Sequence, residues 1–168
     1  MSQYKLLLVD DTPNVLKALK RVFAEEDYKV YTAESANEAS KILQQEVIDV
    51  LITDENMPGI SGTDLLLTVK DTFPDLVKIM ITGETDIEVA KRAINNGEIY
   101  KFFNKPWDDF ELLLSVKYAL KQKQLEKENK QLKTQVSRQA LILEQLEKDF
   151  PGIAEKQVDA DGCIVIEE

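Results

Sequence analysis

The stretch KLLLVDDTP, residues 5–13, sets two aspartates directly after a short apolar run. A short run of branched apolar residues is typical of a parallel strand that is buried on both faces. Pro13 suits the first turn of a following helix, because an N–H at that position would have no intrahelical partner. Asp10 and Asp11 therefore stand where a buried strand is predicted to end and a helix to begin.

The same pattern recurs along the chain, with amphipathic stretches between the apolar runs. The predicted strands are KLLLV (5–9), YKVYT (28–32), VLIT (50–53), VKIMIT (77–82) and IYKFF (99–103). Strands that alternate with helical stretches predict an α/β fold with one parallel sheet, in which we expect every strand to be buried on both faces.

Capping residues predict where the intervening helices begin. The first helix follows Pro13 and runs through VLKALKRVFAEE (15–26). Ser35 and Glu38 have the spacing of a capping box at the start of the second helix. Asp86 is predicted to be the N-cap of the fourth helix, because its carboxylate can accept a hydrogen bond from the first turn.

The composition bounds the class of protein. The chain has 168 residues, enough for one domain of about 120 residues and an extension. Its net charge of −10 and the lack of a basic cluster with aromatic residues argue against direct binding of nucleic acid. A single cysteine, Cys163, and no histidine exclude a disulfide framework, imidazole metal sites and Ser-His triads. Without a membrane segment or signal peptide, a cytoplasmic protein is expected.

A heptad pattern occupies the breaker-free stretch from Trp107 to Pro151. The seam positions, alternately four and three residues apart, are Leu125, Asn129, Leu132, Val136, Gln139, Leu143, Leu146 and Phe150. The spacing predicts a parallel coiled-coil homodimer, with Asn129 favouring two strands in register and Glu128 paired with Lys133 of the other chain. The alternative is one solvated helix, because the seam includes two polar residues.

These patterns divide the chain into three parts. We expect a domain at 1–122, a coiled-coil signalling helix at 123–150 and a C-terminal tail at 151–168. In the tail, DADG (159–162) predicts a β-turn before an apolar CIVI, which we interpret as the start of a further output domain.

Polar groups are predicted to meet at the carboxyl edge of the sheet. Asp54 ends the third strand, and a flavodoxin-like order 2-1-3-4-5 would bring it to Asp10 and Asp11. A divalent cation would offset the repulsion of three carboxylates, and hard oxygen ligands favour Mg²⁺, with Mn²⁺ as a substitute. Thr82 and Lys105 follow the last two strands. A hydroxyl, an ammonium and a cation around a nucleophilic aspartate can stabilise a transferring phosphoryl group.

Over residues 4 to about 120 the chain resembles the receiver domains of response regulators in two-component signalling. The matching motifs, in the expected order, are Asp10-Asp11, Asp54-x-x-Met57-Pro58-Gly59, Thr82-Gly83 and Lys105-Pro106. The resemblance implies a doubly wound (βα)5 sheet and transfer of a phosphoryl group from a sensor histidine kinase to Asp54. It also implies a phosphoacceptor that catalyses only its own phosphorylation and dephosphorylation, and not an enzyme.

The resemblance assigns ligands to the cation. Asp11 would ligate Mg²⁺ directly and Asp10 mainly through water. The Asp54 carboxylate and the backbone carbonyl of Asn56 would be further ligands. Lys105 would pair with the phosphoryl group.

The resemblance also assigns switch residues. The bond from Lys105 to Pro106 would be a cis peptide bond that aims the ammonium inward. Thr82 would hydrogen-bond a phosphoryl oxygen, and Phe102 would change rotamer with it, although Phe102 lacks the hydroxyl of the tyrosine common at this position. Asn56 and Glu84 flank the expected pocket, and we expect them to orient an attacking water that limits the phosphorylation lifetime to minutes or less.

Two other function classes stay open at this point. A metal-dependent phosphatase would use the same nucleophile, yet such enzymes usually carry an aspartate where this chain has Asn56. The second open class is a structural dimerisation module with a silent receiver, one that is not phosphorylated.

The output is unassigned by sequence. The long helix resembles linkers to cyclic-dinucleotide enzymes or ATP-driven transcription activators. The segment NNGEIYKFFNKPWD (95–108) resembles receivers joined to cyclic di-GMP phosphohydrolases.

Overall fold

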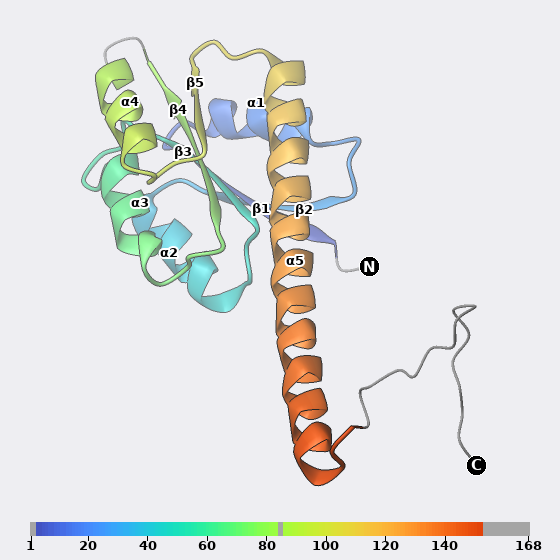
Figure 1. Cartoon of the computed structure of the whole chain (residues 1–168). Coiled ribbons are helices and arrows are strands. Elements are labelled where there is room, and N and C mark those ends of the chain that lie inside the picture. The colour runs from blue at the N-terminus through green and yellow to red at the C-terminus, as the bar shows by residue number, and fades with distance from the viewer. Residues whose placement is uncertain (1–2, 84–85, 153–168) are drawn as a thin grey trace. The chain divides into compact units, whose positions relative to one another are not determined.

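A five-stranded parallel sheet forms the centre of the protein, with strand order β2-β1-β3-β4-β5 (Figure 1). The computed structural model describes residues 3–83 and 86–152. The strands are β1 (Tyr4–Val9), β2 (Tyr28–Ala33), β3 (Val50–Asp54), β4 (Val77–Thr82) and β5 (Lys101–Asn104). The helices are α1 (Pro13–Val22), α2 (Ala36–Gln45), α3 (Gly62–Lys70), α4 (Ile87–Asn95) and α5 (Asp109–Asp149). The predicted fold class and strand order are confirmed.

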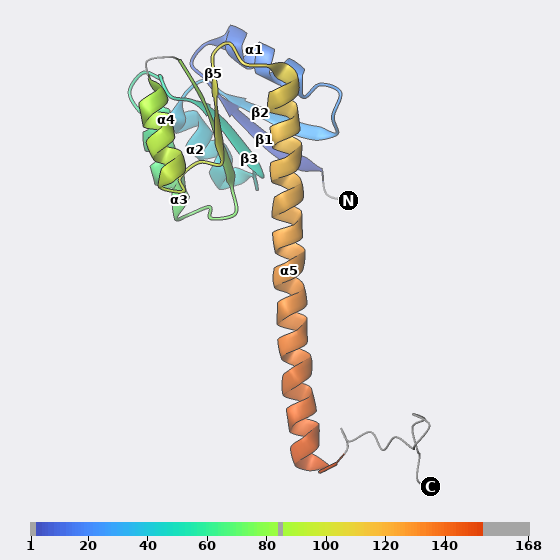
Figure 2. The same ribbon diagram turned by 45° about the horizontal axis from the view of Figure 1, so that its top comes forward.

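Two hydrophobic layers cover the sheet because side chains alternate between its faces along each strand. Figure 2 shows α2, α3 and α4 on one side and α1 and the first turns of α5 on the other. Leu7, Leu51 and Met80 belong to the layer under α2, α3 and α4. Leu8 and Ile52 belong to the layer under α1 and α5. The sheet is therefore doubly wound, with a core on each face.

The two edge strands depart from the expectation that every strand is buried on both faces. In β2 every residue before Ala33 is partly buried or exposed, and only Ala33 is buried. In β5 only Phe103 is fully buried. Each edge strand has a neighbour on one side only, so part of its surface meets solvent. The prediction is wrong for these strands, and β5 also begins at Lys101, two residues later than predicted.

The helix starts differ in detail from the predicted caps. Ser35 Oγ accepts from Glu38 N at 3.2 Å as predicted, but the Glu38 carboxylate accepts from Glu34 N and not from Ser35 N. Among the described residues, Asp86 makes no side-chain hydrogen bond that caps α4, so that predicted cap is wrong. Its carboxylate accepts instead from the side chain of Asn56.

Helix α1 ends earlier than predicted. Its last residue is Val22, and Phe23 at the C-cap is buried in the layer shared with α5. The residues after Phe23 form turns, and Tyr28 N donates to Glu26 O at 2.8 Å as β2 begins. A helix through residue 26 would leave too few residues to reverse the chain into the next strand.

Asp49, just before β3, ties three strands to α5. Its carboxylate accepts from Lys5 N at 2.9 Å and from Lys123 Nζ at 3.0 Å. Its carbonyl accepts from Val77 N at 3.0 Å. Lys123 is the last residue of the first of two compact units, Met1–Lys123 and Gln124–Glu168. This part of α5 is therefore held at the amino ends of β1, β3 and β4.

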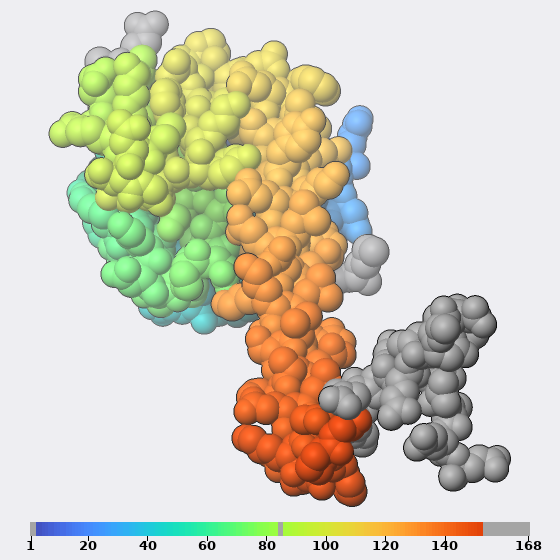
Figure 3. All heavy atoms as spheres, in the orientation of Figure 1, coloured from blue at the N-terminus to red at the C-terminus, as the bar shows by residue number. Residues whose placement is uncertain are grey.

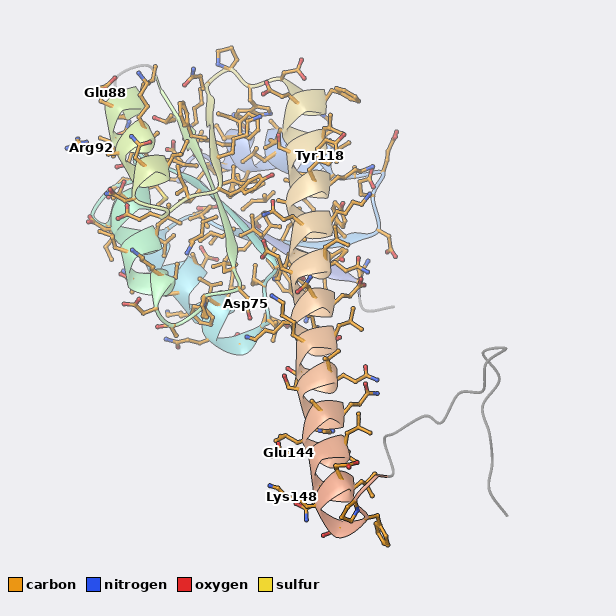
Figure 4. All side chains as sticks on the ribbon, viewed as in Figure 1. Asp75, Glu88, Arg92, Tyr118, Glu144 and Lys148 are labelled. Atoms are coloured by element: carbon orange, nitrogen blue, oxygen red, sulfur yellow. The ribbon has the colours of Figure 1, made fainter. Side chains whose placement is uncertain are left out.

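Beyond Lys123 the described side chains of α5 are almost all exposed (Figure 3). Along the surface of this segment, Lys148 Nζ pairs with Glu144 Oε1 at 3.3 Å, one helical turn away (Figure 4). Within the part of the chain that the structure describes, no helix is long and apolar enough to cross a membrane. The heptad seam and the proposed domain boundaries stay predictions.

Candidate functional site

Three carboxylates meet at the carboxyl ends of β1 and β3. These strands are paired, with Val9 opposite Thr53, so the residues that follow them are neighbours. Asp10 and Asp54 are buried, whereas Asp11 is exposed. One carboxylate oxygen from each of the three lies within 4.8 Å of the others. The structure thus brings together the carboxylates that the sequence predicted to converge.

Lys105 completes the cluster from the end of β5. Its Nζ lies 2.9 Å from Asp10 Oδ2 and 3.0 Å from Asp54 Oδ1. The backbone holds the lysine in place, because Lys105 N donates to Thr82 O at 2.8 Å. The peptide bond from Lys105 to Pro106 is cis. The ammonium therefore bridges two carboxylates that come from different strands.

Burial and neighbouring charges shift the pKa values of Asp54 and Lys105. Burial raises the pKa of the Asp54 carboxyl, and Asp10 and Asp11 add to this, while Lys105 opposes it. Burial lowers the pKa of the Lys105 ammonium, but the hydrogen bonds that it donates to Asp10 and Asp54, together with the charges of these carboxylates, outweigh burial, so the net pKa shift is upward. Three carboxylates face one ammonium, which leaves an excess of negative charge. A hard divalent cation fits this donor set of oxygens.

The loop after Asp54 is fixed by two residues to which the sequence reasoning gave no role. Glu55 is buried, and its Oε2 accepts from Thr63 N at 2.9 Å and from Thr63 Oγ1 at 2.8 Å. At Gly62, a Cβ would stand 2.2 Å from the carbonyl oxygen of Asp54. The first residue of α3 therefore packs directly on the backbone of Asp54. A sequence signal for this close packing exists: α3 begins with glycine, a poor helix former, at a position where other residues would favour the helix more.

The predicted switch residues lie beside the cluster. Thr82 is fully buried at the end of β4, and its hydroxyl donates to Gly83 O at 3.1 Å. Phe102 lies opposite Met80 in the β4 and β5 register and packs, half-buried, on the layer under α4. Asn56 is exposed, and its Nδ2 donates to Asp86 Oδ2. Glu84 falls outside the described residues.

The single tryptophan, Trp107, lies two residues after Lys105. Its ring is partly buried against the layer under α1 and α5. Its Nε1 donates to Asp109 Oδ1 at 2.9 Å. The indole is therefore tied to Asp109, the first residue of α5.

Comparisons with known proteins agree with this geometry. The family model of the response regulator receiver domain matches residues 6–117 of the chain. The hydrogenase transcriptional regulatory protein HoxA of Cupriavidus necator is 32% identical over 143 residues, which are 85% of this chain and 30% of that protein. The transcriptional regulatory protein GlrR of Escherichia coli is 33% identical over 143 residues, 85% of this chain and 32% of that protein. The chain thus spans about a third of the length of these relatives.

Solved structures show the same likeness. The signal receiver domain of an HD domain-containing protein from Pseudomonas fluorescens has a TM-score of 0.69 at 32% identity, covering 73% of this chain and 98% of that one. NtrX from Brucella abortus has a TM-score of 0.72 at 28% identity, covering 78% of this chain and 30% of that one.

Proposed function

Because the chain belongs to the response-regulator receiver family, we propose that Asp54 accepts a phosphoryl group from a sensor histidine kinase in a reaction that needs Mg²⁺. The observation that carries the proposal is the position of Lys105 Nζ, 2.9 Å from Asp10 and 3.0 Å from Asp54. It sets an ammonium beside the buried Asp54 carboxylate at the end of β3.

The oxygen atoms gathered at the site indicate which residues would hold the cation. They are the carboxylates of Asp10, Asp11 and Asp54, whose oxygens lie within 4.8 Å of one another. The resemblance to receiver domains adds the backbone carbonyl of Asn56 as a further ligand. When bound, Mg²⁺ supplies positive charge that offsets the repulsion of these carboxylates and of an incoming phosphoryl group. Manganese has the same preference for oxygen ligands and would substitute.

The chain's own groups carry the transfer. A carboxylate oxygen of Asp54 forms a bond to phosphorus as the bond between phosphorus and the kinase imidazole nitrogen breaks. The leaving nitrogen keeps the electron pair and takes a proton from solvent. Lys105 stabilises the charge on the phosphoryl oxygens, and it needs little rearrangement because it already touches Asp54.

The switch follows from the new hydrogen-bond acceptor. Thr82 now donates to the neutral carbonyl of Gly83. A phosphoryl oxygen on Asp54 is a charged and stronger acceptor, which would draw Thr82 and its loop toward the site. Phe102, half-buried on the neighbouring strand, repacks as the loop moves. Phosphorylation thus stabilises one arrangement through contacts that the other lacks, which is what a population shift requires.

The long helix α5 is the proposed route to the output. The heptad seam predicts a parallel homodimer over residues 123–150, in which two receivers are coupled. The curated relatives HoxA and GlrR are transcriptional regulatory proteins, and each match extends over 143 residues, beyond the 6–117 of the receiver match. Transcriptional regulation is therefore the output class that the relatives favour.

The phosphorylation test uses a small phosphodonor such as acetyl phosphate. The wild-type chain is expected to gain the mass of one phosphoryl group with Mg²⁺ and none with excess EDTA, measured by intact mass spectrometry and peptide mapping to Asp54. The absence of labelling in Mg²⁺ would favour the silent dimerisation module. Sustained turnover of a small phosphomonoester would instead support the phosphatase.

The dimer test uses two leucines of similar exposure. Leu132 is 61% exposed at a d position, and Leu141 is 66% exposed at an f position, off the seam. Leu132→Glu is expected to halve the molar mass in light scattering, because it places like charges in the centre of the seam, whereas Leu141→Glu keeps the dimer mass. A wild-type chain of monomer mass, or equal behaviour of the two variants, contradicts the seam.

A further inference from the structure

Asp86 occupies the N-cap position of α4 but does not use its side chain as a cap. An N-cap aspartate ordinarily accepts a hydrogen bond from the first turn of its helix. Among the described residues, the Asp86 carboxylate makes no such bond, and Asp86 Oδ2 accepts from Asn56 Nδ2 instead. The carboxylate thus reaches a residue of another loop.

This hydrogen bond connects the two loops on either side of Asp54. Asn56 lies two residues after Asp54, in the loop between β3 and α3. Asp86 lies four residues after Thr82, in the loop between β4 and α4. The strands that lead into these loops are paired, with Asp54 opposite Ile81. The bond therefore joins the two loops that follow the paired strands bearing Asp54 and Thr82.

The chemistry of the pair fixes the orientation of the amide. A carboxylate can only accept hydrogen bonds, so the Asn56 side chain must present its NH₂ group to Asp86. An amide flipped by half a turn would set its oxygen against the carboxylate and repel it. The NH₂ group is thus engaged, and the side-chain oxygen of Asn56, Oδ1, is left as an acceptor.

We propose that Asp86 is a positioning residue for hydrolysis of the phosphorylated Asp54, because it holds the side-chain oxygen of Asn56, Oδ1, where that oxygen accepts a hydrogen bond from the attacking water. This inference rests on the proposed function. The water oxygen forms a bond to phosphorus while the bond from phosphorus to the Asp54 oxygen breaks. The carboxylate is restored with the electron pair of that bond, and both protons of the water leave with inorganic phosphate.

The geometry gives the reason for a rate effect. The water must approach phosphorus in line with the Asp54 oxygen that leaves, and one fixed acceptor restricts its orientation. Without Asp86 the amide can rotate about its side-chain bonds, since the carboxylate bond is the contact that determines which end faces the site. The predicted lifetime control by Asn56 therefore needs a second residue, from a different loop.

The test compares decay of the aspartyl phosphate in the 168-residue wild-type chain, Asn56→Ala, Asp86→Ala and the double variant. Each protein is labelled with acetyl phosphate and Mg²⁺, the donor is removed, and the remaining phosphorylated chain is followed by intact mass. Asp86→Ala is expected to lengthen the half-life roughly 5-fold, as expected for loss of one orienting contact. In the Asn56→Ala background, Asp86→Ala is expected to change nothing further. Asp86→Asn, whose amide oxygen can still accept from Asn56, is expected to restore most of the wild-type rate.

Each other result overturns the inference. An unchanged half-life in Asp86→Ala removes the role of Asp86. A slowdown of equal size with and without Asn56 shows that Asp86 acts through α4 or through its charge. An Asp86→Asn variant as slow as Asp86→Ala shows that charge and not positioning matters. If wild type itself takes no label, the proposed function fails; labelled variants with equal lifetimes overturn only the inference.

Discussion

Replacing Asp11 by alanine is expected to lower Mg²⁺-dependent labelling of Asp54 by about 100-fold or more, the usual effect of removing a group that stabilises a transferring charge. The carboxylate is one of three whose oxygens lie within 4.8 Å of one another, and it is the exposed one. Its removal leaves two carboxylates to hold the cation. Because Asp11 is exposed, the free energy of unfolding is expected to stay within about 0.5 kcal/mol of wild type.

Asp75 offers a matched control for this experiment. It is also an exposed aspartate, but it precedes β4 and so lies at the opposite, amino-terminal edge of the sheet (Figure 4). Asp75→Ala makes the same change in net charge and should label at the wild-type rate. Initial labelling rates over a series of Mg²⁺ concentrations make the comparison. Normal labelling of Asp11→Ala would show that the cation is held by a different set of ligands.

Gly62→Ala is expected to destabilise the protein by about 1–3 kcal/mol and to slow labelling of Asp54 strongly. The new Cβ would stand 2.2 Å from the Asp54 carbonyl oxygen and 3.0 Å from the Glu55 Cα, both backbone atoms that cannot rotate away. Either α3 or the end of β3 must move. A shift of about 1 Å in a reacting group can cost about 100-fold in rate.

Urea unfolding measures the stability of this variant, and labelling with acetyl phosphate measures its site. Gly97→Ala is the control, because its Cβ meets nothing within 4 Å while its φ of +69° disfavours a side chain. That control should lose about 1 kcal/mol and keep the wild-type labelling rate. A Gly62→Ala protein as stable and as reactive as wild type would show that α3 yields without moving Asp54.

The central strands and the carboxylate cluster could be predicted because each rests on a local pattern. Strands β3 and β4 end in Asp54 and Thr82, Asp10 directly follows β1, and a parallel sheet places such ends on one edge. Edge strands were less predictable, since the run of residues in β2 does not say how many neighbours the strand has. Burial depends on strand order as well as on sequence.

Contacts between distant loops were beyond the reach of local patterns. Asp86 has the residue type and position of an N-cap, and nothing near it in sequence indicates that Asn56, 30 residues earlier, takes its carboxylate. Glu55 and Thr63 likewise meet only because the loop between them folds back. A cap and a bond across a site compete for the same side chain, and the folded geometry decides between them.

The position of Trp107 gives the protein an optical reporter of its own. The chain has one tryptophan, Trp107, which follows Lys105 by two residues. Its indole is fixed by the hydrogen bond that it donates to Asp109. Fluorescence selectively excited at the indole therefore originates at Trp107 and nowhere else in the chain. Cation uptake or acyl phosphate formation that displaces Lys105 should change the emission intensity, so both events can be timed in a stopped-flow instrument without any added dye.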